Sequence, residues 1–369
     1  MSLIVDGTTG VTFNDSSLQG AAASPYVLKN RIINGDMRID QRNAGASVTI
    51  TTGNPYTLDR WWAVCSASSK YSVQQNAGSV TPPAGYTNYL GVTSLSSYSV
   101  SSGDYFWITQ RIEGFNVADL AFGTSSAKSI TISFLVYSSL TGTFGAGIRN
   151  SAANRCYPFS YTISSANTWT QISVTIPGDT SGTWITNNGV GIELDFGLGF
   201  GSTYSGTAGA WTSSNIYVPT GSVSVVGTNG ATFYITGVQL EIGTSATPFE
   251  RRLYGQELIN CQRYYQKYTS TAAGDGICFG GYGFPQSSSI FRLIGAFPIT
   301  MRTGPTFSYS NLSVSTSGGT QSTVSSSAGI GANSTGYDLN LNVTVTTGTP
   351  YFLRATSGNN GYVDFSAEL

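Results

Sequence analysis

The sequence contains no histidine, and only 9% of its 369 residues are charged. Without histidine, Ser-His-Asp and Cys-His catalysis and histidine-ligated metals are excluded. A formal net charge of −1 offers no basic field that would attract nucleic acid. No glycine-rich loop opens a helix and no apolar run reaches the length of a membrane span, so neither a phosphate cradle nor membrane insertion is predicted.

Cysteine is scarce, and its pattern indicates no metal site. Cys65, Cys156, Cys261 and Cys278 lack the paired spacing that zinc requires. We expect Cys65 and Cys156, which fall in or near strand-like runs, to be small buried hydrophobic residues. The first residues lack the basic region and cleavage site of a signal peptide, so we expect synthesis in a reducing cytoplasm.

What the sequence does contain is typical of strands and turns. There are 45 glycines, 22 tyrosines, 18 phenylalanines and 6 tryptophans, and Ser, Thr and Asn take the place of charged residues. Disordered chains are poor in aromatic and β-branched residues, so disorder is excluded. The fold class predicted is all-β: a jelly-roll β-sandwich and a smaller C-terminal β-sandwich tip, linked by one short helix.

Residues 30–250 are predicted to form the jelly-roll sandwich, because alternating runs recur between Gly, Pro and Asn clusters. We expect its first and last strands to lie near each other. The runs are 32–39, 71–75, 105–112, 130–137, 172–176, 192–198, 222–226 and 233–242.

Two smaller units flank this domain. Residues 1–29 contain two very short strand-like runs and are either a flexible leader or an attachment segment. Residues 269–369 are predicted to form the tip, with Ser315 to Ser334 as an exposed loop. The strands expected in the tip are 277–284, 291–294, 306–309, 312–314, 339–345, 351–354 and 362–365.

The stretch from Phe233 to Tyr268 joins the two β domains. It begins as an alternating strand in which Gly237 marks a bulge. Pro248 bars any helix before it. We expect a helix over 251–268, because apolar residues then recur at spacings of 4, 3, 4 and 3. This seam comprises Tyr254, Leu258, Cys261, Tyr265 and Tyr268. Two interpretations of this pattern stay open: a helix packed on its own domain, or a short coiled-coil neck that joins three identical chains.

The same stretch resembles a segment common in bacteriophage tail-fibre and related virion proteins. Matching motifs run in one order from residue 30 to the last residue. They are Asn30-Arg31-Ile32-Ile33-Asn34-Gly35-Asp36-Met37, Gln41-Arg42, Tyr56-Thr57-Leu58-Asp59-Arg60-Trp61-Trp62, Gln239-Leu240-Glu241, Ala246-Thr247-Pro248-Phe249-Glu250-Arg251-Arg252, Glu257-Leu258, Cys261-Gln262-Arg263-Tyr264-Tyr265, Phe297-Pro298-Ile299-Thr300-Met301-Arg302, Pro305-Thr306 and Val363-Asp364-Phe365-Ser366-Ala367-Glu368-Leu369.

This resemblance implies a tail-fibre protein of the virion, made in the host cytoplasm and docked to other tail or baseplate proteins through its N-terminus. It also implies a homotrimer that adheres to host surface polysaccharide without catalysis. The sandwich is similar, at the level of architecture, to jelly-roll carbohydrate-binding modules. The alternatives are a structural virion component, such as a head fibre or baseplate adaptor, and a spike that depolymerises polysaccharide.

Sugar binding requires flat aromatic faces beside polar groups, and five aromatic residues lie in or beside predicted loops. They are Tyr204, Trp211, Tyr282, Phe284 and Tyr309. Trp61, Trp62 and Trp107 lie within alternating runs, so we expect them in the core.

Carboxylate pairs are the remaining catalytic route. Glu193 and Asp195 share one face of a predicted strand, where we expect a solvated surface and no enzymatic activity. No cofactor is predicted. A structural calcium ion near the first and last strands of the sandwich could take oxygen ligands from Asp36, Asp40 and Glu241.

Overall fold

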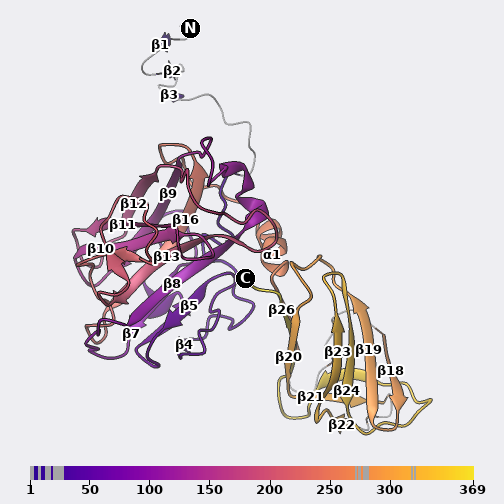
Figure 1. Cartoon of the computed structure of the whole chain (residues 1–369). Coiled ribbons are helices and arrows are strands. Elements are labelled where there is room, and N and C mark those ends of the chain that lie inside the picture. Colours follow the sequence, from indigo (N-terminus) through magenta and orange to yellow (C-terminus); the bar gives the residue numbers. More distant parts are fainter. Residues whose placement is uncertain are drawn as a thin grey trace.

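The computed structural model describes residues 29–270, 272, 276, 282–316, 319 and 321–369, together with three short leader strands. The leader strands β1 (Ile4–Asp6), β2 (Gly10–Thr12) and β3 (Leu18–Gln19) pair in order as an antiparallel sheet. The first two agree with the short runs seen in the sequence. Figure 1 shows the large sandwich in indigo through magenta to salmon and the C-terminal unit in orange to yellow.

The large domain is a sandwich of two antiparallel sheets, as predicted. One sheet has the order β11-β10-β13-β8-β5 and the other β12-β9-β16-β7-β6-β4. The first contains β11 (Cys156–Ile163), β10 (Gly142–Arg149), β13 (Val190–Phe200), β8 (Tyr105–Glu113) and β5 (Trp62–Cys65). The second contains β12 (Thr170–Ile176), β9 (Ile130–Ser138), β16 (Thr232–Ile242), β7 (Leu90–Ser94), β6 (Tyr71–Gln75) and β4 (Val48–Thr49).

The space between the sheets is filled by one large hydrophobic core. Trp61, Phe134, Phe196 and Phe233 are each at most 1% exposed and lie in this core. Trp107 is also buried, on the other side of its sheet, while Trp62 is half-buried there. The expectation that Trp61 and Trp107 are core residues is therefore confirmed. Three short 3-10 turns and two small strands complete the domain: η1 (Ala77–Ser79), η2 (Gly114–Asn116), η3 (Ala118–Leu120), β14 (Ser205–Gly206) and β15 (Val218–Pro219).

Strand β16 contains the bulge predicted at Gly237, and the bulge changes which side chains face the core. The register with β9 shifts between Thr236 and Gln239, and Gly237 has a φ of 62°. Phe233 and Ile235 face the core before the bulge, and Val238 and Leu240 face it afterwards. The bulge predicted at Gly237 is therefore confirmed, and it moves the core-facing side chains from odd to even positions along β16.

The two expected strands 32–39 and 222–226 are not strands. Asn34 and Met37 adopt positive φ, so the first segment turns. It nevertheless lies beside β16, as expected for the start of the domain: the Arg31 amide donates to Leu240 O (2.9 Å), and the Val238 amide donates to Gly35 O (2.9 Å).

The predicted helix is shorter than the sequence suggested. Helix α1 (Tyr254–Gln262) is followed at once by strand β17 (Tyr265–Thr269), so Tyr265 and Tyr268 belong to a strand. Cys261 is fully buried and Tyr265 is 4% exposed within the chain, so neither is accessible to another chain. The seam Tyr254, Leu258, Cys261, Tyr265 and Tyr268 therefore does not form on one helix, and α1 packs within its own chain through Glu257 and Cys261. Within the described part of the chain, no helix has the length and hydrophobicity of a transmembrane span.

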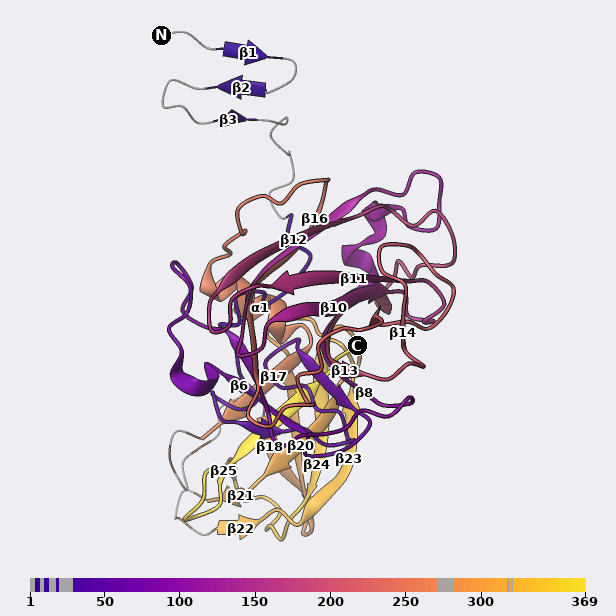
Figure 2. The same ribbon diagram turned by 90° about the vertical axis from the view of Figure 1, so that its left-hand side faces the viewer.

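The C-terminal unit consists of three small sheets with their own core. Figure 2 shows this unit in orange to yellow, in the lower part of the view. Their orders are β17-β26-β20, β18-β19-β24-β23 and β22-β21-β25. The strands after β17 are β18 (Tyr282–Ser287), β19 (Ile290–Ala296), β20 (Thr306–Ser310), β21 (Leu312–Ser315), β22 (Gln321–Thr323), β23 (Ser326–Ala332), β24 (Gly336–Asn342), β25 (Phe352–Ala355) and β26 (Tyr362–Ser366). The loop expected from Ser315 to Ser334 contains β22 and β23, because its small polar residues pair with β21 and β24.

The motifs that carry the tail-fibre resemblance converge on the joint around α1. Glu257, 3% exposed, accepts a hydrogen bond from the Asn34 amide. Arg252 Nη1 donates to Ile32 O (3.0 Å) and to Glu257 Oε2 (3.2 Å). The Asn34 side chain donates to Asp59 O (3.0 Å). These residues hold the helix against the sandwich, so the motifs encode a structural joint.

Candidate functional site

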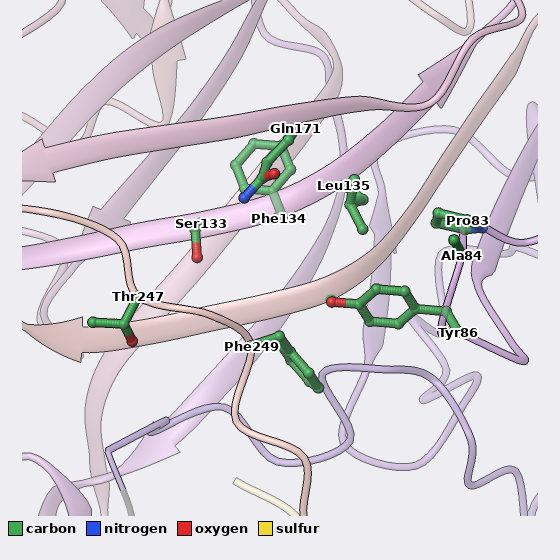
Figure 3. Close-up of a pocket in the computed structure, with 10 residues that line it drawn as sticks. Pro83, Ala84, Tyr86, Ser133, Phe134, Leu135, Gln171, Thr247 and Phe249 are labelled. Carbon is green, nitrogen blue, oxygen red and sulfur yellow. The ribbon is translucent and has the colours of Figure 1, made fainter. Parts of the chain in front are cut away.

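The outer face of the six-stranded sheet carries an open pocket of about 390 Å³. Its floor comes from β9, β12 and β16, and its walls come from the loop before β7 and the hinge after β16 (Figure 3). The lining residues are Pro83, Ala84, Tyr86, Ser133, Phe134, Leu135, Gln171, Gly237, Thr247 and Phe249. None of them is charged, so the pocket suits an uncharged ligand.

The floor is ordered by strand register. Leu135 lies opposite both Gln171 and Thr236, and Ser133 lies opposite Gln239. Because side chains alternate along a strand, the outward groups of the three strands form rows across the sheet. Gln171 is exposed and presents an amide on the same face as the Ser133 hydroxyl of the neighbouring strand (Figure 3). Amide and hydroxyl groups of this kind can donate to and accept from a polyhydroxylated ligand.

Two aromatic rings form the wall opposite Gln171. Tyr86 and Phe249 are half-buried, with ring centroids 5.5 Å apart. The Arg251 guanidinium lies 4.4 Å from the Tyr86 ring centroid, within range of a cation–π contact. The Tyr86 hydroxyl points across β16 at the bulge (Figure 3), where a Cβ on Gly237 would lie 2.6 Å from it. Burial raises the pKa of Tyr86, so its hydroxyl stays protonated at neutral pH and can donate a hydrogen bond.

The hinge that carries Phe249 is fixed by the Gln239-Leu240-Glu241 motif. Glu241 accepts from the Thr247 amide (2.8 Å) and from the Thr247 hydroxyl (2.7 Å). Gln239 Oε1 accepts from the Glu250 amide (2.8 Å). The motif therefore folds residues 247–250 back over the sheet and sets the position of Phe249.

A row of aromatic side chains extends the pocket along the same face. Tyr137 and Trp169 are half-buried and lie two residues from Leu135 and Gln171, which places them on the same side of their strands. The Tyr137 ring stacks on Tyr234 with centroids 5.4 Å apart, and Trp169 packs against Tyr137 at the same distance. The pocket and this row make one continuous surface of aromatic and uncharged polar groups.

The opposite face of the sandwich holds a buried charge cluster in place of the expected solvated carboxylates. Glu193 is 4% exposed and Asp195 is fully buried. Arg149 Nε lies 3.1 Å from Asp195 Oδ2, and Arg111 Nε lies 2.8 Å from Glu193 Oε1. Burial raises the pKa of Asp195 to about 6, against the opposing effect of Arg149. Tyr217 covers Arg149, so these carboxylates are structural and not accessible to a substrate.

The five sequence-predicted ligand residues are dispersed. Tyr204 packs on Tyr105 and Tyr217 beside the charge cluster. Trp211 belongs to a different aromatic group, where its Nε1 donates to Pro177 O (2.8 Å). Phe284 is 43% exposed on β18, and Tyr309 stacks on Phe307 in the C-terminal core. The side chain of Tyr282, like Cys278, lies outside the described residues.

The three proposed calcium ligands are likewise not brought together. Asp36 pairs with Arg38 (2.6 Å), and Asp40 accepts from the amides of Asn43 and Gly45. Glu241 holds Thr247 as described above. No group of three or more possible metal-ligating side chains occurs among the described residues. The calcium site predicted from Asp36, Asp40 and Glu241 is therefore wrong.

The sequence does not predict that Tyr86, Gln171 and Phe249 lie together, because they come from three separate segments. Phe249 lies within a motif that the sequence singled out, but nothing in the sequence places it beside Tyr86. The nearest available signal was Gly237, since a bulge glycine often marks a close approach by another group.

Comparison with family models finds no match, and neither does comparison with curated protein sequences. Several solved structures are similar in fold. The enzymatically active domain of tailspike protein 4 from bacteriophage CBA120 matches 61% of this chain and 22% of its own, with 14% identity and a TM-score of 0.30. A putative sugar-binding protein from Bacteroides thetaiotaomicron matches 58% of this chain and 100% of its own, with 11% identity and a TM-score of 0.35.

A family 11 carbohydrate-binding module from Clostridium thermocellum matches 55% of this chain and 98% of its own, with 15% identity and a TM-score of 0.28. The chain spans about a fifth of the length of the tailspike domain that it matches. At these identities the likeness concerns the sandwich fold alone.

Proposed function

We propose that this protein is a non-catalytic carbohydrate-binding adhesin, and that the pocket lined by Tyr86, Gln171 and Phe249 holds a neutral sugar. The observation that carries the proposal is the pairing of two half-buried aromatic rings with an exposed amide in a pocket without charge. Aromatic faces bury the apolar faces of sugar rings, while amide and hydroxyl groups satisfy the hydroxyls.

The biological setting that fits is a phage tail fibre that attaches the virion to a host surface polysaccharide. Support comes from the motif order described in the sequence and from the absence of an accessible carboxylate pair at Glu193 and Asp195. N-terminal attachment to other virion proteins remains part of this proposal. The homotrimer expected from the sequence is left out of it, because the helical seam that suggested a trimer does not form on α1.

The alternative of a structural virion component draws on one specific observation. Most motifs of the resemblance lie in the joint around α1 and the C-terminal tail, which is the internal framework of the molecule. A framework of this kind could be shared by proteins that bind no glycan. The experiment below separates the two functions.

The test is affinity electrophoresis of the full chain in gels that contain neutral polysaccharides: glucan, mannan and galactan. We expect retardation in at least one gel, and Tyr86→Ala and Phe249→Ala should each weaken it about tenfold or more, because each ring buries apolar area worth roughly 1.5–3 kcal/mol. Tyr254→Ala is the matched control, since Tyr254 is 56% exposed on α1 and outside the pocket.

Two results would count against the proposal. If no polysaccharide and no host cell retains the wild-type chain, the protein is structural. If Tyr254→Ala weakens binding as much as Tyr86→Ala, the pocket is not the site. Shortening of the polymer during incubation would instead indicate a depolymerase.

A further inference from the structure

Strand β12 forms an open edge of the six-stranded sheet. It pairs with β9 over seven consecutive residue pairs, from Thr170 to Ile176, and in the described part of the chain no strand lies on its other side. Within the described residues, no backbone group of β12 forms a hydrogen bond outside this pairing. An edge strand presents alternate N–H and C=O groups to solvent, where another strand can bind them.

This edge lacks the features that keep other edges from pairing. Its sequence, Thr-Gln-Ile-Ser-Val-Thr-Ile, contains no charge and no proline, and its register shows no bulge. At the other sheet, the edge of β11 is capped by a bridge between Cys156 and Thr212, with both backbone hydrogen bonds at 2.9 Å. At the far edge of the six-stranded sheet, β4 has only two residues. Natural proteins rarely leave a long, uncharged edge exposed.

We propose that β12 pairs antiparallel with β12 of a second copy of this chain, across a two-fold axis perpendicular to the sheet. The register centred on Ser173 places Ser173 opposite its own copy and Gln171 opposite Thr175. These three side chains are exposed on one face, and all are uncharged. A two-fold axis sets the residue at its centre against its own copy and pairs the flanking residues symmetrically, so a strand without charge suits self-pairing.

The arrangement has a consequence for the pocket, and this part rests on the proposed function. Antiparallel pairing within one plane joins two six-stranded sheets and keeps their outer faces on the same side. Gln171 lies on β12 and lines the pocket, so the two pockets would open onto one continuous surface. Two linked sites on a repetitive polymer bind more tightly than one, through effective concentration.

The experiment measures the mass of the full chain in solution by sedimentation, without any glycan, so its outcome does not depend on the proposed function. The wild type should sediment at twice the chain mass of 38.8 kDa. Ser173→Lys should halve the mass, because it sets two lysines against each other at the axis. Ser160→Lys is the matched control: Ser160 is an exposed serine on β11, in the other sheet, and its substitution should leave the mass unchanged.

A second variant covers the case in which Ser173→Lys fails to fold. Ser173→Cys should form an intermolecular disulfide under mild oxidation, because directly opposed side chains lie within about 4.5–5.5 Å at Cβ. Ser160→Cys should not cross-link, and it reports the background from the natural cysteines. A wild-type chain that sediments as a monomer, or as a trimer unaffected by Ser173→Lys and not cross-linked through Ser173→Cys, would overturn the proposal.

Discussion

Arg60 of the sandwich and Glu368 near the end of the chain form a buried ion pair across 308 residues of sequence. The Arg60 side chain is 1% exposed and that of Glu368 is 6% exposed. Arg42 Nη2 lies 2.7 Å from the other oxygen of the same carboxylate, and the Tyr264 ring covers the Arg60 guanidinium at 3.6 Å. Figure 1 shows the C-terminus at this joint. The last residues therefore lock the C-terminal unit onto the sandwich.

Replacing Glu368 with alanine should destabilise the protein strongly. The substitution leaves the Arg60 charge buried without its partner, which costs about 3–5 kcal/mol. The measurement is urea denaturation followed by tryptophan fluorescence. The control is Asp338→Ala, which removes a pair with Arg292 whose side chains are 35% and 33% exposed. Because water screens this pair, the free energy of unfolding should fall much less than in Glu368→Ala. Equal losses of unfolding free energy in the two variants would show that the buried pair of Arg60 and Glu368 does not hold the two units together.

Gly237→Ala should weaken both stability and glycan binding. Gly237 has a φ of 62°, and its new Cβ would meet the Tyr86 hydroxyl at 2.6 Å. The positive φ costs roughly 1–2 kcal/mol, and the clash moves Tyr86 out of the pocket wall. Gly230→Ala is the matched control, since Gly230 has a φ of 74° and nothing within 4 Å of the added Cβ.

Thermal melting and affinity electrophoresis measure the two effects. Gly230→Ala should lose stability but keep full binding, whereas Gly237→Ala should lose more stability and much of its binding. Unimpaired binding by Gly237→Ala would remove Tyr86 from the site.

Asp59 should make the protein less stable as pH rises from about 4 to 6. Burial raises the pKa of Asp59 to about 6, against the opposing effect of Arg42. In the unfolded chain the carboxyl ionises near pH 4, so on raising the pH the unfolded state loses its proton first and is favoured. Relative to Asp59→Asn, the free energy of unfolding of the wild type should fall by on the order of 3 kcal/mol between pH 4 and 7.

Urea denaturation at the two pH values measures this difference. Asp338→Asn serves as the control of opposite sign, because the hydrogen bond from Arg292 lowers the pKa of Asp338. Relative to that variant, the wild type should gain stability as pH rises. A pH-independent difference between the wild type and Asp59→Asn would show that Asp59 is not buried as described.

Cys261 should resist alkylation in the folded protein. Its side chain is fully buried within the chain. Burial also raises the pKa of its thiol well above the ordinary value. The thiolate is the reactive form, so iodoacetamide should label Cys261 only after unfolding. Peptide mapping by mass spectrometry measures the labelling, and Ser160→Cys provides an exposed thiol for comparison. Rapid labelling of native Cys261 would indicate that α1 detaches from the sandwich.

Local sequence patterns predicted much of the sandwich. The alternation at 130–137 and 105–112 corresponds closely to β9 and β8, and Gly237 marks the bulge in β16. Strand β10 was missed because Gly-Thr-Phe-Gly-Ala-Gly-Ile-Arg has three glycines and little alternation. Its glycines admit close neighbours: a Cβ on Gly147 would lie 2.3 Å from Tyr217 O. Such close approach by a distant segment cannot be read from the strand itself.

The helix shows how tertiary packing overrides a local pattern. A seam at spacings of 4, 3, 4 and 3 predicted a helix to Tyr268, but β26 pairs with residues 265–269 and converts them to a strand. Likewise, Glu193 and Asp195 looked like a solvated pair until Arg149 and Arg111, from two other strands, were found beside them.

The sequence by itself determined the all-β class and the exclusion of histidine chemistry, because composition and local periodicity do not depend on contacts between distant segments. Only the tertiary structure decided which residues line a pocket that could bind a ligand. The pocket joins Tyr86, Gln171 and Phe249 from segments more than 70 residues apart, through strand register and the folded-back hinge. Contacts of that range depend on which strands pair, and pairing is a property of the whole chain.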